Sequence, residues 1–452
     1  MDILYKFSQI LWGYPLILLL SFGGIFLTIK LNFFQFRYFF YILKTTFFSI
    51  HKKPKGTGTV TPFQAISSTL ACTVGAGNII GVPAAIVFGG PGAIFWMWVI
   101  ALFGMATKFT EAALAVCYRT KNKKNEYVGG PMYYMTRGLK MKWLAIWFST
   151  ALMIEVIPSV MIQGNSIAGS ALSTFNIPPY ITGLIIMFIV SLVIIGGIKR
   201  IGHFAEVIVP FMAIIYIGSV IIVFIMSIEE FPKVLALIFK NAFTAVAPIG
   251  GFAGATLIEV IRWGAARGAY SNEAGVGTAP IAHATATTDH PTRQGLWAMV
   301  GILVDTIIVC TATAYVILAS DIWKAEFART NTSGLTALAF ENFFGPYGSL
   351  IVTISLIFFV ISTIIVLSWY GEKQAEFLFG DLGAKIIKYV YVISAFVGAI
   401  GAARFIWNLI DLALAMAIIP NMIALLLLSN KAKKLKEEFF NTPNRYYLNE
   451  RK

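Results

Sequence analysis

Apolar runs of membrane-spanning length restrict what this chain can fold into. A helix needs about 20 apolar residues to cross the bilayer hydrocarbon, and the sequence carries eleven runs of that kind. They lie near residues 11–32, 61–88, 92–117, 143–175, 178–197, 204–227, 248–287, 294–320, 347–371, 384–402 and 404–430. Since 58% of the residues are hydrophobic and only 12% are charged, the apolar content exceeds that of a soluble domain. The sequence predicts an all-α polytopic membrane protein with about 11 transmembrane helices.

The basic residues are divided among the loops between these runs. The net charge of +14 comes from short clusters, including 37–55, 119–142 and 431–452, and no single patch suggests a nucleic-acid partner. Cytoplasmic loops carry an excess of Lys and Arg. We therefore expect a multi-pass protein of the cytoplasmic (inner) cell membrane, with the amino terminus outside and the carboxyl terminus in the cytoplasm.

The order of the runs suggests two related halves. Beyond the first run, ten remain, and five per half is an odd number, so the second half must be inverted relative to the first. This division predicts an amino-terminal extra helix with a basic loop at 1–60, repeats at 61–228 and 229–430, and a basic cytoplasmic tail at 431–452. In such folds the interrupted helix of each half marks the binding site.

A glycine-rich break lies inside the second run, at Thr73–Asn78. No water satisfies free backbone groups in the hydrocarbon, so a break there must line a cavity or bind something. The carbonyls of Ala71, Thr73 and Val74 are candidate ligands of a hard cation, and the amides at Gly77 and Asn78 are candidates for a carboxylate. The alternative is that the glycines serve close helix packing. The second half opens with a glycine-rich stretch at 250–254 and carries another at 264–277, and these are the matching expected breaks.

Three segments resemble the alanine or glycine:cation symporter family across nearly the whole chain. They are Thr73–Gly81 (TVGAGNIIG), Glu126–Tyr134 (EYVGGPMYY) and Arg267–His283 (RGAYSNEAGVGTAPIAH). The resemblance implies the five-plus-five inverted-repeat fold of the bacterial leucine transporter. It also implies small neutral amino acids as substrates, with sodium, or in some members protons, as the coupling ion. No covalent cofactor is implied.

The same resemblance distributes roles around the first break. It implies that Ala71 and Val74 lend carbonyls to one sodium position and that Asn78 serves a second. Two positions depart from many relatives, because Ala76 stands where Thr is frequent and Leu367 where Trp is frequent. Both leave the choice among alanine, glycine and serine open.

A polar stripe follows the run at 143–175. At about 100° per residue, Glu155, Ser159, Gln163 and Ser166 share one face, which should look into the bundle or a wet cavity. The amide oxygen of Gln163 is our candidate acceptor for a substrate ammonium. Glu155 is either a proton or cation site or a residue near the aqueous end of a long, tilted helix.

Hydroxyls at Ser362 and Thr363 are candidates to complete a sodium shell or to touch the ligand; the alternative is hydrogen bonding to their own helix. Asn272 is the polar candidate from the second break. The predicted substrate residues are Gly75, Ala76, Gly77, Gln163, Asn272 and Thr363, and the predicted sodium ligands are Ala71, Val74, Asn78, Ser362 and Thr363.

The predicted function is sodium-coupled import of small neutral amino acids, namely alanine and glycine, by alternating access. The partners are then the amino acid, sodium and the bilayer. The alternatives are a proton-coupled amino-acid transporter and, less favoured, a channel or a membrane-embedded enzyme. The sequence shows no nucleotide-binding loop and no zinc-ligand spacing.

Overall fold

The computed structural model describes residues 15–50, 52–248, 252–401 and 403–450, and this part of the chain is almost entirely helical. One short hairpin pairs strand β1 (Thr120–Lys121) with strand β2 (Tyr127–Val128) in antiparallel register. The main helices are α2 (Pro15–Lys30), α5 (Pro62–Thr73), α6 (Val82–Gly89), α7 (Ala93–Cys117), α9 (Lys142–Phe175), α10 (Pro179–Ile194), α11 (Gly197–Met226), α13 (Leu257–Asn272), α15 (Pro291–Ile302), α16 (Thr311–Ala319), α18 (Tyr347–Ile400) and α19 (Ala403–Leu427).

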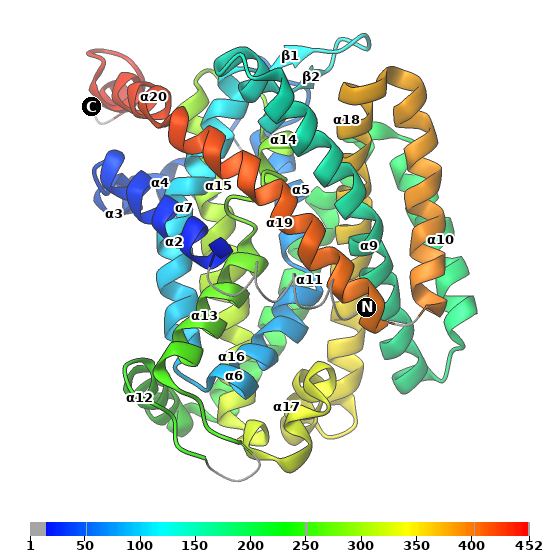
Figure 1. Cartoon of the computed structure of the whole chain (residues 1–452). Coiled ribbons are helices and arrows are strands. Elements are labelled where there is room, and N and C mark those ends of the chain that lie inside the picture. Colours follow the sequence, from blue (N-terminus) through cyan, green and yellow to red (C-terminus); the bar gives the residue numbers. More distant parts are fainter. Residues whose placement is uncertain (1–14, 51, 249–251, 402, 451–452) are drawn as a thin grey trace.

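Smaller helices cap the two ends of this bundle (Figure 1). At one end lie the basic segments, and at the other lie the connections that carry α12 (Phe231–Ala242) and α17 (Leu335–Phe344). The other smaller helices are α3 (Phe34–Arg37), α4 (Phe39–Thr45), α8 (Pro131–Tyr133), α14 (Ala279–His283), α20 (Ser429–Asn441) and α21 (Tyr446–Glu450). Figure 1 shows α3, α4, the hairpin and α20 at one end, with α12 and α17 at the other.

Several helices are long and apolar enough to cross a membrane. Within the described residues there are five by length and composition, or up to seven if each of two bent pairs counts as one span. Helices α2 and α10 are apolar as well, but each has 16 residues. The structure therefore agrees with a polytopic membrane protein. The count of 11 spans, the inverted repeat and the boundaries between the predicted halves stay predictions.

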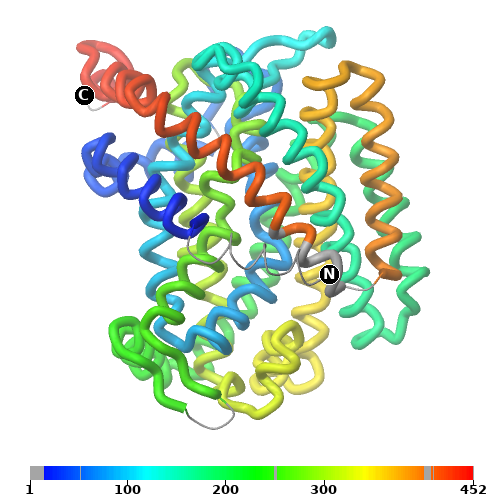
Figure 2. Tube along the Cα trace, in the orientation of Figure 1, coloured from blue at the N-terminus to red at the C-terminus, as the bar shows by residue number. Residues whose placement is uncertain are grey.

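Helix α18 contains two of the predicted spans in one continuous stretch. Gly380 has a non-helical conformation (φ 71°, ψ −162°), and there the chain turns back on itself (the orange segment in Figure 2). A methyl group built on Gly371 would meet the hydroxyl of Tyr391 at 2.2 Å, which places the two arms in contact. Gly164 of α9 approaches the second arm equally closely, with its added methyl 2.4 Å from the carbonyl of Ala395.

The two interrupted helices start alike. Thr61 caps α5 and Thr256 caps α13, and each forms a reciprocal capping box with the third residue of its helix, Gln64 or Glu259. Such a box satisfies two backbone amides that a helix start leaves open. The capping boxes fix where each broken helix begins.

Both helices then break as the sequence predicts. Helix α5 ends at Thr73, a π-helical segment starts at Gly77, and the two parts are bent by 45°. Helix α13 ends at Asn272, and Glu273, Gly275 and Gly277 all have positive φ before α14 begins. Glycine tolerates that conformation at little cost. The stretch 249–251, which includes Gly250 of the other expected break, lies outside the described residues.

The carboxyl-terminal arm docks on the end that carries the basic loops. Helix α20 packs Phe439 near the ring of His290, which also lies 4.6 Å from the ring of Tyr446. The Nδ1 atom of His290 accepts a hydrogen bond from the amide of Thr292 and so caps α15. Burial lowers the pKa of His290, partly opposed by Glu438 at 3.8 Å.

We predict that acidification weakens this cap. The folded pKa lies below the unfolded value of about 6.5, so the unfolded chain binds the proton first; stability is complete above that pH and falls as the pH drops below it. His290→Asn keeps a capping acceptor without the titration. Below about pH 6.5 the thermal midpoint of the wild type should fall further than that of this variant. The extra loss of unfolding free energy should reach up to about 1 kcal/mol, the usual contribution of a helix cap. Identical pH profiles would contradict the assignment.

Candidate functional site

A buried cavity lies where the two breaks meet. Its volume is about 50 Å³, which exceeds the roughly 10–15 Å³ needed to hold a single water. Contributions come from α5, α9, α13, α18 and the outer helices α2 and α19. The lining comprises Leu20, Cys72, Thr73, Gly75, Gly77, Glu155, Ser159, Gln163, Ala269, Tyr270, Ser271, Glu273, Val276, Thr278, Thr363, Leu367, Leu414 and Ile418.

Hydroxyl and carbonyl oxygens gather on one side of this cavity. The hydroxyls of Ser362 and Thr363 lie 3.2 and 3.1 Å from the carbonyl oxygen of Ala71. Thr363 is also 3.3 Å from the carbonyl of Cys72. Each hydroxyl also lies within hydrogen-bond distance of the carbonyl of Phe359 in its own helix. Both hydroxyls therefore face the end of α5 and their own helix at once. Val74 is the extended C-cap of α5, and its carbonyl leaves the helical ladder.

The glycine at position 75 permits this approach. A methyl group built on Gly75 would lie 2.8 Å from the hydroxyl oxygen of Thr363, closer than carbon and oxygen normally come. Any larger residue at this position would push the Thr363 hydroxyl away from the end of α5. The close-packing interpretation of Gly75 agrees with this contact, and ligand binding at Gly75 stays a prediction.

Asn78 belongs to a second polar cluster behind the break. Its side-chain oxygen accepts from the amide of Gly75 at 2.9 Å, and its amide group donates to a carboxylate oxygen of Asp305 at 2.8 Å. Ser271 and Thr306 donate to the other oxygen of Asp305, at 2.7 and 2.9 Å. The cluster is fully buried. It joins the two breaks to the helical segment that follows α15.

The polar stripe of α9 faces the cavity, as predicted from its spacing. Glu155, Ser159 and Gln163 all line it, and Ser166 bonds to its own helix. Ser159 donates to one oxygen of Glu155. Within the described residues the other Glu155 oxygen and the Gln163 amide oxygen are buried without a hydrogen-bond partner. Glu155 lies in the cavity wall and is buried, which favours the first of its two interpretations, a proton or cation site.

Glu273 adds a second carboxylate to the lining. It stands at the point where α13 ends, in the left-handed conformation (φ 52°). Thr278 donates to this carboxylate at 2.5 Å, and the thiol of Cys72 lies 3.6 Å from it. A side chain of the second break, Glu273, thus contacts Cys72 at the end of α5.

Lys108 and Asn421 satisfy the carbonyls that the second break leaves open. The buried ammonium of Lys108 on α7 donates to the carbonyls of Asn272 and Glu273 at 2.8 and 3.1 Å. Asn421 on α19 donates to the carbonyl of Gly275 at 2.9 Å. A cation at a helix carboxyl end is favourable.

Two predicted substrate residues lie away from the cavity lining. Asn272 lines a separate small pocket beside α7, where its side-chain oxygen accepts from the amide of Ala274 at 3.0 Å. Ala76 is buried within the first break but does not line the cavity. The structure thus brings together Gly75, Gly77, Gln163 and Thr363 at the cavity. The side chain of Asn272 lies beside α7 instead, and its contact with substrate stays a prediction.

The site predicted from the sequence does not include Asp305, Glu273 or Lys108. Each is an ionisable residue within an apolar run, which is itself a functional signal. Their partners could not be identified, because Asp305 meets Asn78 across 227 positions and Lys108 meets Asn272 across 164. Leu20, from the helix considered to be extra, was also unexpected in the lining.

Long apolar helices and two interrupted helices that meet at a small cavity are features of a membrane transporter. A family model described as the sodium:alanine symporter family matches residues 1–450. The chain belongs to this family.

Three relatives illustrate the similarity. An uncharacterized transporter, YflA, of Bacillus subtilis (strain 168) is 56% identical over 98% of this chain and 93% of its own length. The sodium/alanine symporter AgcS of Methanococcus maripaludis is 44% identical, covering 93% of each chain. The probable sodium/glutamine symporter GlnT of Bacillus subtilis is 37% identical over 93% of this chain and 87% of its own length.

The contact between Gly75 and Thr363 yields a stability prediction. Gly75→Ala should destabilise the protein by about 1–3 kcal/mol, the usual cost of overpacking, because the new methyl collides with the Thr363 hydroxyl. Adding Thr363→Ala should recover part of that loss. Thermal unfolding of purified protein measures both variants.

Gly169→Ala on α9 is the matched control, because a methyl group there meets nothing within 4 Å. It should leave stability unchanged or slightly raised, since alanine favours helices over glycine. Equal unfolding midpoints for Gly75→Ala and Gly169→Ala would show that the close approach has no energetic weight.

Proposed function

We propose that this chain is a secondary active symporter that imports alanine and glycine with sodium by alternating access. The observation that carries the proposal is the approach of the Ser362 and Thr363 hydroxyls to the Ala71 carbonyl at the end of α5. Oxygen ligands from a broken helix and its neighbour are what transporters offer to sodium. Val74 contributes a further carbonyl at the same helix end.

A second cation position lies at Asn78. Its amide oxygen accepts from the Gly75 amide, and its NH2 group donates to the buried Asp305 carboxylate, to which Ser271 and Thr306 also donate. A carboxylate enclosed in hydrocarbon is costly unless a partner balances its charge, and sodium supplies that charge. Occupation of this position would link the two breaks.

The substrate occupies the adjacent cavity. Its carboxylate faces the backbone amides that follow the break at Gly77, where a helix start favours negative charge. Its ammonium group meets the Gln163 amide oxygen, which has no hydrogen-bond partner within the described residues. A volume of about 50 Å³ favours a small side chain. Leu367 also lines this cavity and contributes an apolar wall.

The membrane arrangement completes the proposal. The two halves, 61–228 and 229–430, form an inverted repeat, supported by the matching capping boxes at Thr61 and Thr256. The amino terminus lies outside and the basic tail, 431–452, lies in the cytoplasm. Helix α2 and its loop, 1–60, precede the repeats.

Transport into proteoliposomes tests the function directly. Alanine uptake should require a sodium gradient, because one sodium ion moving down a tenfold gradient and ~100 mV supplies roughly 3.7 kcal/mol, enough for about 500-fold accumulation. Potassium in place of sodium is the control. Absence of gradient-driven uptake for every small amino acid tested would refute the symporter.

Thr363→Val tests the cation site without altering side-chain size. Losing a hydrogen bond or ligand to a charged group costs about 1.5–3 kcal/mol, so the sodium concentration for half-maximal uptake should rise about tenfold or more. Thr353→Val is the matched control on the same helix, because Thr353 contacts Thr174 instead. Similar sodium dependence in both variants would remove Thr363 from the site.

Proton coupling is the second candidate, and Glu155 is the observation that favours it. One of its carboxylate oxygens faces the cavity region without a hydrogen-bond partner among the described residues. If protons drive transport through this group, Glu155→Gln should abolish uptake driven by a proton gradient in sodium-free buffer. If sodium drives it, the variant should retain sodium-dependent uptake, and the wild type should show none without sodium.

A further inference from the structure

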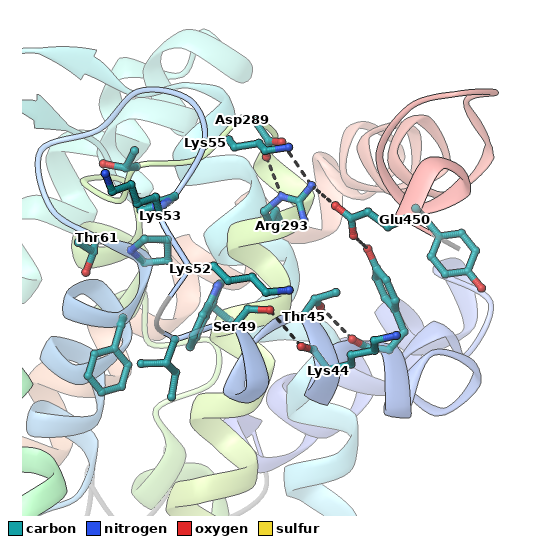
Figure 3. Close-up of a pocket in the computed structure, with 18 of the residues that line it drawn as sticks. Lys44, Thr45, Ser49, Lys52, Lys53, Lys55, Thr61, Asp289, Arg293 and Glu450 are labelled. Atoms are coloured by element: carbon teal, nitrogen blue, oxygen red, sulfur yellow. Dashed lines mark hydrogen bonds and ion pairs between the residues drawn. The ribbon is translucent and has the colours of Figure 1, made fainter. Parts of the chain in front are cut away.

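A large basic pocket lies at the end of the bundle that carries α4 and the carboxyl-terminal arm. Its volume is about 760 Å³, far larger than that of the central cavity. It is bordered by α4, the 52–55 loop, the start of α5 and the start of α15. Lys44, Lys52, Lys53, Lys55 and Arg293 supply its basic side chains. Figure 3 shows these residues around the open space.

The acidic residues of the pocket already have partners. Arg293 bonds to Asp289 at 2.7 Å and to Glu450 at 2.9 Å, and Figure 3 shows it between them. Glu206 accepts from the side chain of Gln64 at 2.9 Å. By contrast, none of the four lysines forms an ion pair with a carboxylate of the described residues. The pocket therefore offers four uncompensated ammonium groups to an anion.

Apolar side chains connect this pocket to the membrane-facing surface. Phe40 borders it and is 85% exposed, and Phe48 nearby is 79% exposed. Helix α2 exposes Leu18, Phe22 and Ile29 on its outer side. Exposed aromatic rings of this size are unfavourable in water but suit acyl chains. A ligand that satisfies both features has an anionic head and a hydrocarbon tail.

We propose that this pocket binds the phosphate headgroup of an anionic phospholipid. The lysines contact the phosphate, and Phe40 and Phe48 contact the upper acyl chains. Basic pockets between transmembrane helices on the cytoplasmic side, and lysine clusters next to a membrane helix, are known modes of anionic lipid recognition. Thr61, Pro62 and Phe63 at the start of α5 also border the pocket, so the bound lipid contacts the helix that leads into the first break. This proposal does not depend on the transported solute.

Native mass spectrometry of the full-length protein in detergent tests the proposal. Dioleoyl phosphatidylglycerol and dioleoyl phosphatidylcholine are titrated separately. The anionic lipid should bind more tightly to the wild type. Lys52→Gln combined with Lys53→Gln should weaken it by about tenfold or more, as expected for removing two charges beside an anionic headgroup.

Lys124→Gln combined with Lys140→Gln is the matched control, because it removes the same charge from exposed lysines outside the pocket. This variant should bind the anionic lipid like the wild type. Equal affinity for the two lipids, or equal losses in the two double variants, would overturn the proposal. Thermal unfolding checks that both variants are folded.

Inorganic phosphate alone distinguishes the two sources of the anion. Millimolar phosphate should leave the unfolding midpoint of the lipid-free protein unchanged if the acyl chains contribute to binding. A rise in that midpoint that disappears in the Lys52/Lys53 variant, without preferential lipid binding, would assign the pocket to a free anion and overturn the lipid.

Discussion

Backbone groups inside the hydrocarbon must find partners within the protein, and the rest of this structure depends on that requirement. Two helices break in the middle of the bundle, and each break frees amides and carbonyls. At the first break, Asn78 accepts from the Gly75 amide while Thr363 and Ser362 approach the Ala71 carbonyl. At the second, Lys108 and Asn421 donate to the carbonyls that the break frees. The same groups that stabilise the breaks form the candidate site.

The two breaks are satisfied by different chemistry. The second break has a permanent cation, Lys108, at the end of α13 and a side-chain amide, Asn421, at Gly275. Near the open carbonyls of the first lie the hydroxyls of Ser362 and Thr363, and the Glu273 carboxylate approaches the thiol of Cys72. A helix end of partial negative charge without a fixed positive partner is suited to a cation that comes and goes. This difference supports the placement of sodium at the first break and a structural role for Lys108 at the second.

Close packing determines how much room is left for a ligand. Glycine at position 75 allows the Thr363 hydroxyl to reach the end of α5, and Gly164 allows α9 to contact the second arm of α18. Glu155 and Gln163 thereby reach the cavity from α9. The cavity is small because these helices approach closely, and its size is the main physical argument for a small amino acid.

The sequence by itself determined the class, the breaks and the polar stripe. Apolar run length, Gly75 with Gly77, and the spacing of Glu155, Ser159 and Gln163 are local properties, set by hydrocarbon thickness and helix geometry. Only the tertiary structure decided that Asn78 meets Asp305, that Lys108 caps the second break and that Asn272 turns toward α7. These contacts join residues far apart in the chain, so they depend on the packing of whole helices, which no local pattern encodes.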